Sequence, residues 1–128
     1  MKFNEQYEKI KFAPGVYNDE FLAYGTFLAH ISHIFTQDLE FLSVYFFELL
    51  SSYDTILHPR TRLQIVQNLI MMRNKGLLKC DVLILKFFKL FKLQDKNLRN
   101  VIKSYMLSDL KKENKKHKNI KLNKKLQN

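Results

Sequence analysis

Hydrophobic residues recur three and four positions apart along most of the chain, which is the spacing of one face of an α-helix. One clear set follows Asp38, a residue type that often caps a helix N-terminus: Leu39, Leu42, Phe46, Leu49 and Leu50. Alternating strand patterns, hairpin dipeptides and glycine-rich loops are missing from the sequence. The pattern therefore predicts an all-α fold.

Capping and turn-forming residues divide this pattern into five helices, after an opening segment that Pro14-Gly15 breaks. The residues expected to begin or cap them are, in chain order, Asn18, Asp38, Pro59, Asp81 and Asp95. The first helix is expected to reach about residue 35 and the third to stop at Gly76. The fourth should cover residues 82–93, and the fifth carries apolar residues as far as Leu110.

Helix starts near residues 38, 59 and 81 make a two-helix unit of roughly 40 residues, the size of a HEAT or armadillo repeat. A compact antiparallel bundle would show the same spacing. The helix expected at 82–93 favours a stacked array, because it is apolar around nearly its whole circumference and should be flanked on several sides. Its narrow polar stripe consists of Lys86, Lys89 and Lys92.

Composition excludes several classes of protein. The longest stretch without formal charge, residues 21–37, is too short to span a bilayer, so no membrane partner is expected. Cys80 is the only cysteine, which rules out a disulfide framework and a thiolate metal site within these 128 residues. His30 and His33 come without a third ligand, and Cys80 lacks an activating partner. The sequence therefore predicts a protein that is not an enzyme and uses no metal, cofactor or small-molecule substrate.

The net charge of +10 is unevenly distributed. Residues 1–72 carry a net charge of −3 and residues 73–128 a net charge of +13. We expect a helical-repeat domain at residues 1–110, followed by a basic segment at 111–128 whose candidate RNA- or partner-binding residues are Lys111, Lys112, Lys115, Lys116, Lys118, Lys121, Lys124 and Lys125. Lysines suit phosphates, so RNA would be bound through its backbone, without sequence preference and with strong salt dependence. A solvated helix face and a nuclear import signal are the alternatives.

Seven short stretches carry a family likeness: residues 27–33 (FLAHISH), 55–59 (TILHP), 69–78 (LIMMRNKGLL), 95–99 (DKNLR), 108–111 (SDLK), 117–119 (HKN) and 126–128 (LQN). These stretches resemble sequences of the SDA ("severe depolymerisation of actin") family. The resemblance spans roughly residues 13–128 and is densest in the second half. Its motif residues include Arg73, Asn74, Lys75, Asp95, Lys96, Arg99, Asp109, His117 and Asn119.

The resemblance implies an armadillo/HEAT-like antiparallel array of about five to six helices. It also implies a nuclear and nucleolar factor needed for maturation and nuclear export of the large (60S) ribosomal subunit. The partners would be the pre-60S particle, through rRNA and assembly factors, and an import receptor that reads the basic segment. Family members continue for several hundred residues beyond the match, so this chain would be their N-terminal helical region, as a truncated gene model or a naturally short form. The alternative is a protein-only adaptor in nuclear transport or actin cytoskeleton organisation.

Overall fold

The computed structural model describes the backbone of residues 2–127 and the side chains of residues 3–112, 114 and 115. This part of the chain forms helices joined by short turns, without strands. The helices are α1 (Lys2–Phe12), α2 (Asp19–Ile31), α3 (Glu40–Ser52), α4 (Pro59–Asn74), α5 (Cys80–Leu90) and α6 (Lys96–Gln127). The expectation of an all-α protein with five to six helices is confirmed.

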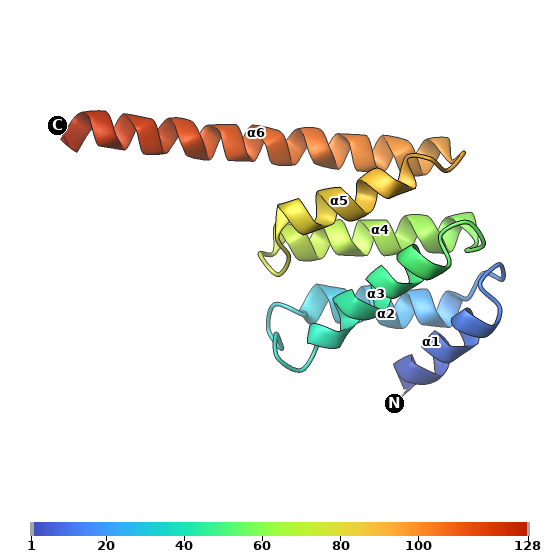
Figure 1. The fold of residues 1–128 in the computed structure, drawn as a ribbon. Coiled ribbons are helices and arrows are strands. Elements are labelled where there is room, and N and C mark those ends of the chain that lie inside the picture. Colours follow the sequence, from blue (N-terminus) through green and yellow to red (C-terminus); the bar gives the residue numbers. More distant parts are fainter. Residues whose placement is uncertain (1, 128) are drawn as a thin grey trace.

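The helices form two layers. In one layer α2 packs against α4 and α4 against α6; α1, α3 and α5 lie across them in the other layer (Figure 1). Helices α1, α3 and α5 each run antiparallel to the next helix in the chain (Figure 1). Helices α2, α4 and α6 all run in the same direction. An up-and-down bundle would alternate the direction of neighbouring helices. The arrangement is therefore a HEAT-like stack of helical pairs, which settles the alternative that the spacing left open.

A continuous apolar core runs between the two layers. Its largest fully buried side chains include one aromatic ring from each of three helices: Phe21, Phe46 and Phe87. Phe46 packs edge-on against Phe21, with 6.3 Å between the ring centroids. Close approach of α3 to α2 needs a small residue at position 25, because a Cβ atom there would lie 3.2 Å from Cζ of Phe46. Aromatic burial of this kind is the dominant stabilising contribution in a small domain.

Local capping explains several helix ends. The Asn18 side chain accepts a hydrogen bond from Phe21 N at 3.0 Å, and the Nδ1 atom of His58 accepts one from Arg60 N at 3.1 Å, with Pro59 in the first turn. Gly76 follows α4 with φ of 83°, a conformation that favours glycine. These helix ends are the ones predicted from the sequence.

Other boundaries differ from the expectation. The opening segment is itself a helix, α1, and α2 ends at Ile31, where buried Ser32 donates a hydrogen bond to Ala29 O at 2.7 Å. The cap of α3 is Leu39, without a side-chain cap bond, so the role predicted for Asp38 is wrong. The helix expected at 82–93 covers Cys80–Leu90 and has Lys79 as its cap, while Asp81 bonds the adjacent N–H of Val82 inside the first turn. Leu39 is itself buried, so at the start of α3 a buried apolar residue occupies the position expected for a polar capping residue.

The prediction that the fourth of the expected helices, α5, is covered on several sides is wrong for the part of the chain that the structure describes. Only Leu83, Phe87 and Leu90 are buried, whereas Leu85 and Phe88 are each 69% exposed. One helix face packs on the core, and no further described helix lies on the other side. The polar stripe lies toward α3, where Lys86 is placed over the ring of Phe47.

Candidate nucleic-acid interface on the last helix

The start of α6 is fixed by a buried ion pair. Asp95 accepts a hydrogen bond from Leu98 N at 3.1 Å, as expected of a cap, and its other oxygen lies 3.0 Å from Nη2 of Arg62. Arg62 is buried and also donates to the carbonyl oxygen of Asp54 at 2.8 Å. A single side chain thus connects α4, the turn after α3 and the start of α6. The sequence reasoning identified Asp95 but missed Arg62, because only the fold brings the two together.

The surroundings of Asp95 lower its pKa. Burial alone would raise the pKa of this carboxyl group, but the hydrogen bond from Leu98 N and the Arg62 guanidinium outweigh that effect. The charged form is therefore the one that the folded state favours.

We expect Asp95→Asn to make stability less dependent on acid pH. A carboxyl group with a lowered pKa contributes stability above its unfolded pKa of about 3.9, and this contribution is lost as pH falls through the folded pKa. Urea midpoints measured between pH 7 and pH 2 should therefore fall less steeply for the variant, from a lower value at pH 7. Parallel curves for variant and wild type would contradict this role of Asp95; Asp38→Asn, in the exposed loop, is the control.

A second polar cluster holds the middle of α6 to the end of α4. Asp109 is 2% exposed and accepts hydrogen bonds from Tyr105 Oη at 2.6 Å and from Arg73 Nε at 3.3 Å. One turn further, Lys112 Nζ donates to Oδ1 of Asn74 at 3.2 Å. Burial and the bond to Asp109 both raise the pKa of Tyr105. Three residues of the family motif therefore make contacts between α4 and α6: Arg73 with Asp109, and Asn74 with Lys112.

The remaining motif residues separate into two groups. Lys75, Lys96 and Arg99 are exposed, so the structure gives them no shared internal contact. The side chains of His117 and Asn119 lie outside the described residues. The functional role of the motif as a whole stays a prediction.

The described lysines of the basic segment line one surface hollow on α6. Lys111, Lys112 and Lys115 are exposed and, with Ser104, Leu107 and Ser108, line a surface hollow of about 470 Å³. The candidate residues Lys116, Lys118, Lys121, Lys124 and Lys125 follow on the same helix, but their side chains lie outside the described residues. The backbone of α6 continues from Lys96 to Gln127 without interruption and projects past α4 and α5 (Figure 1). The boundary between residues 110 and 111 thus marks a change of charge within one helix, and as a domain boundary it stays a prediction.

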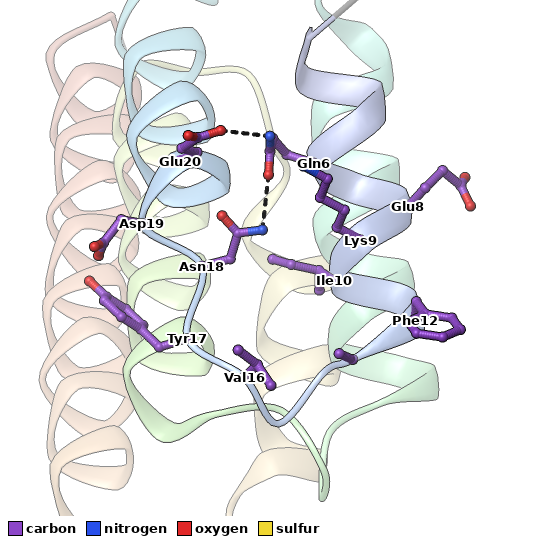
Figure 2. Close-up of a pocket in the computed structure, with 11 residues that line it drawn as sticks. Gln6, Glu8, Lys9, Ile10, Phe12, Val16, Tyr17, Asn18, Asp19 and Glu20 are labelled. Carbon is purple, nitrogen blue, oxygen red and sulfur yellow. Dashed lines mark hydrogen bonds between the residues drawn. The ribbon is translucent and has the colours of Figure 1, made fainter.

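A hollow at the other end of the fold has a different character. It occupies about 670 Å³ between α1 and the turn before α2 (Figure 2). Gln6 points into it and donates to Glu20 at 2.7 Å while accepting from Asn18 at 3.0 Å. Glu8 and Asp19 are also in its lining, which makes the surroundings acidic and unsuited to phosphate.

The candidate metal and nucleophile positions do not converge in the structure. His30 and His33 are both exposed and Cys80 is half-buried. Among the described residues, no group of three or more His, Cys, Asp or Glu side chains could hold a metal ion. None of the described helices combines the length and apolar character needed to cross a membrane.

Comparison with known proteins identifies the family. A family model for the SDA1 HEAT repeat matches residues 27–128. A protein SDA1 homolog from Xenopus laevis is 37% identical over 121 residues, which are 94% of this chain and 18% of that protein. Homologs from Dictyostelium discoideum and Drosophila melanogaster are 35% identical over 112 residues and 41% identical over 80 residues; these matches cover 85% and 62% of this chain, and 15% and 11% of the relatives. The chain thus spans less than one fifth of the length of these relatives. It belongs to the SDA1 family, within the HEAT-repeat part of that family.

Proposed function

We propose that this chain acts in the nucleus and nucleolus as a non-enzymatic assembly factor of the large (60S) ribosomal subunit, needed for its maturation and export. In this proposal the helical body contacts assembly factors of the pre-60S particle, and the basic part of α6 contacts rRNA. Membership of a HEAT-repeat family suggests a scaffold rather than a catalyst.

The observation that carries the RNA contact is the placement of eight lysines, at residues 111–125, on the projecting end of one continuous helix. A helix satisfies its backbone hydrogen bonds internally, so its backbone can leave the helical body and still keep successive lysine positions in helical register. Each lysine that meets a phosphate releases a condensed counterion, which gives strong but sequence-independent affinity. The Asp109 cluster and the bond between Lys112 and Asn74 fix the direction in which this array leaves the body.

We expect charge reversal in the distal lysines to remove the protein from pre-60S particles. The variant Lys118→Glu, Lys121→Glu, Lys124→Glu, Lys125→Glu should bind an rRNA fragment at least about 100-fold more weakly at physiological salt, because repulsion replaces four phosphate contacts. Sedimentation of the tagged native protein in sucrose gradients should shift from the 60S region to the top.

A matched variant controls for total charge. Lys9→Glu, Lys79→Glu, Lys89→Glu, Lys103→Glu changes the same number of exposed lysines outside the basic segment and should leave sedimentation unchanged. Co-sedimentation of the distal variant with particles would overturn the RNA contact. RNase treatment separates the two functional classes, since a protein-only adaptor keeps its partners and a particle factor loses most of them.

A further inference from the structure

A groove between α4 and α6 leads into the lysine-lined hollow. It has a volume of about 460 Å³, and its lining consists of Gln67, Ile70, Asn100, Val101, Ser104 and Tyr105. Ser104 lines both the groove and the hollow that contains Lys111, Lys112 and Lys115. The two are therefore adjoining parts of one surface on α6, which we call the α4/α6 groove and the lysine hollow.

The α4/α6 groove combines an apolar wall with amide side chains. Ile70, Val101 and Tyr105 supply the apolar part, while Gln67 and Asn100 are exposed. An unpaired RNA base needs an apolar surface for its faces and groups that can both donate and accept hydrogen bonds at its edge. Amide side chains offer both.

The lysine hollow lies where the phosphate of such a nucleotide would be. Ser108 is one turn of helix beyond Ser104, a separation of roughly 6 Å along the axis, which is comparable to that between a base and its phosphate. Three lysines and two serine hydroxyls can neutralise and hydrogen-bond a phosphate. The hollow beside α1, by contrast, is acidic, so this combination does not recur there.

Both parts of the surface are held in place before any ligand binds. Tyr105 forms part of the groove wall, and its hydroxyl group is bonded to buried Asp109, which also pairs with Arg73. Its ring packs edge-on against Phe87, with 5.6 Å between the ring centroids. Lys112 is bonded to Asn74 at the end of α4. A preformed site loses less conformational entropy on binding than a flexible one.

We propose that the α4/α6 groove receives one unpaired base of an RNA while the lysine hollow binds the adjacent phosphate. This inference rests on the proposed RNA contact and adds to it a requirement for an unpaired base. The base-binding part lies on α4 and on α6 before residue 111, a region for which the sequence predicted no RNA contact. The charge of the adjoining hollow favours a nucleotide over the apolar side chain of a partner protein.

The test measures binding of the whole chain to three fluorescein-labelled RNAs by anisotropy: a mixed-sequence 12-nucleotide single strand, the same strand paired with its complement, and a version abasic at its central positions. Wild type should bind the single strand about tenfold more tightly than the abasic strand. Gln67→Ala, Asn100→Ala replaces two exposed residues and should abolish this difference while leaving duplex affinity unchanged. Circular dichroism checks that the variant is folded.

The lysine hollow has its own variant and control. Lys111→Ala, Lys115→Ala should weaken binding of all three RNAs and reduce the slope of log affinity against log salt by about two. Lys79→Ala, Lys89→Ala removes two exposed lysines that line neither the groove nor the hollow, and its effect should be clearly smaller. Equal affinity of wild type for intact and abasic strands would overturn the base site but leave the phosphate contact standing. Failure to bind any RNA would overturn the proposed RNA contact of α6 itself. Loss of a protein partner alone from the amide variant would assign the groove to protein.

Discussion

Replacing Phe46 with alanine should lower the free energy of unfolding by about 4 kcal/mol, the largest effect that we expect from a single core substitution. The ring is fully buried, packs edge-on against Phe21 of α2 and fills the space left by Gly25. Its removal leaves a cavity between α3 and α2 that the surrounding helices can close only in part. Urea denaturation followed by circular dichroism at 25 °C measures the change.

Val44→Ala is the matched control, because Val44 lies on the same helix and is 62% exposed. It should change the free energy of unfolding by less than about 0.5 kcal/mol. A loss below about 1.5 kcal/mol for Phe46→Ala would mean that α3 can move to fill the cavity, and would contradict the close fit between Gly25 and Phe46.

Removing the carboxylate of Asp109 should cost about 3 kcal/mol, because Asp109→Ala leaves the Arg73 guanidinium and the Tyr105 hydroxyl without their shared acceptor. The effect should be local as well as global. Hydrogen exchange is expected to increase most in α6 and at the end of α4, since the cluster joins these two helices.

Two further variants test this interpretation of Asp109. Asp109→Asn keeps the shape and one acceptor oxygen, so it should lose less stability than the alanine variant. Ser108→Ala, at an exposed neighbouring position, should stay within about 0.5 kcal/mol of wild type. Equal losses for Asp109→Asn and Asp109→Ala would assign the effect to the charge alone, and no loss for either would contradict the anchoring role.

The residues of the family motif could be predicted from the sequence, but their contacts could not. The residues Arg73, Asn74 and Asp109 could be identified from the sequence as part of the family motif. Their actual contacts join residues 36 and 38 positions apart. A pattern of three- and four-residue spacing contains no information at that range. The position of Arg62 opposite Asp95 was missed for the same reason.

Part of the candidate interface could likewise be predicted from the sequence, and part could not. The charge difference between the two parts of the chain, and the concentration of lysines after residue 110, are properties of the sequence. The positions of Ser104, Ser108, Lys111, Lys112 and Lys115 on one side of α6 follow from helical spacing once that helix is known to be continuous. The adjoining groove could not be found in this way, because one of its three apolar residues, Ile70, and one of its two amides, Gln67, come from α4.

By itself, the sequence determined that the chain is helical, where α2, α4 and α6 begin, which family it resembles and where its positive charge lies. These properties depend on interactions between residues within a few positions of one another. Only the tertiary structure decided that the helices stack as pairs, that α2, α4 and α6 run in the same direction, and that α5 leaves Leu85 and Phe88 exposed. The physical reason is that an apolar face fixes which side of a helix must be covered, but not which distant segment covers it or whether one does.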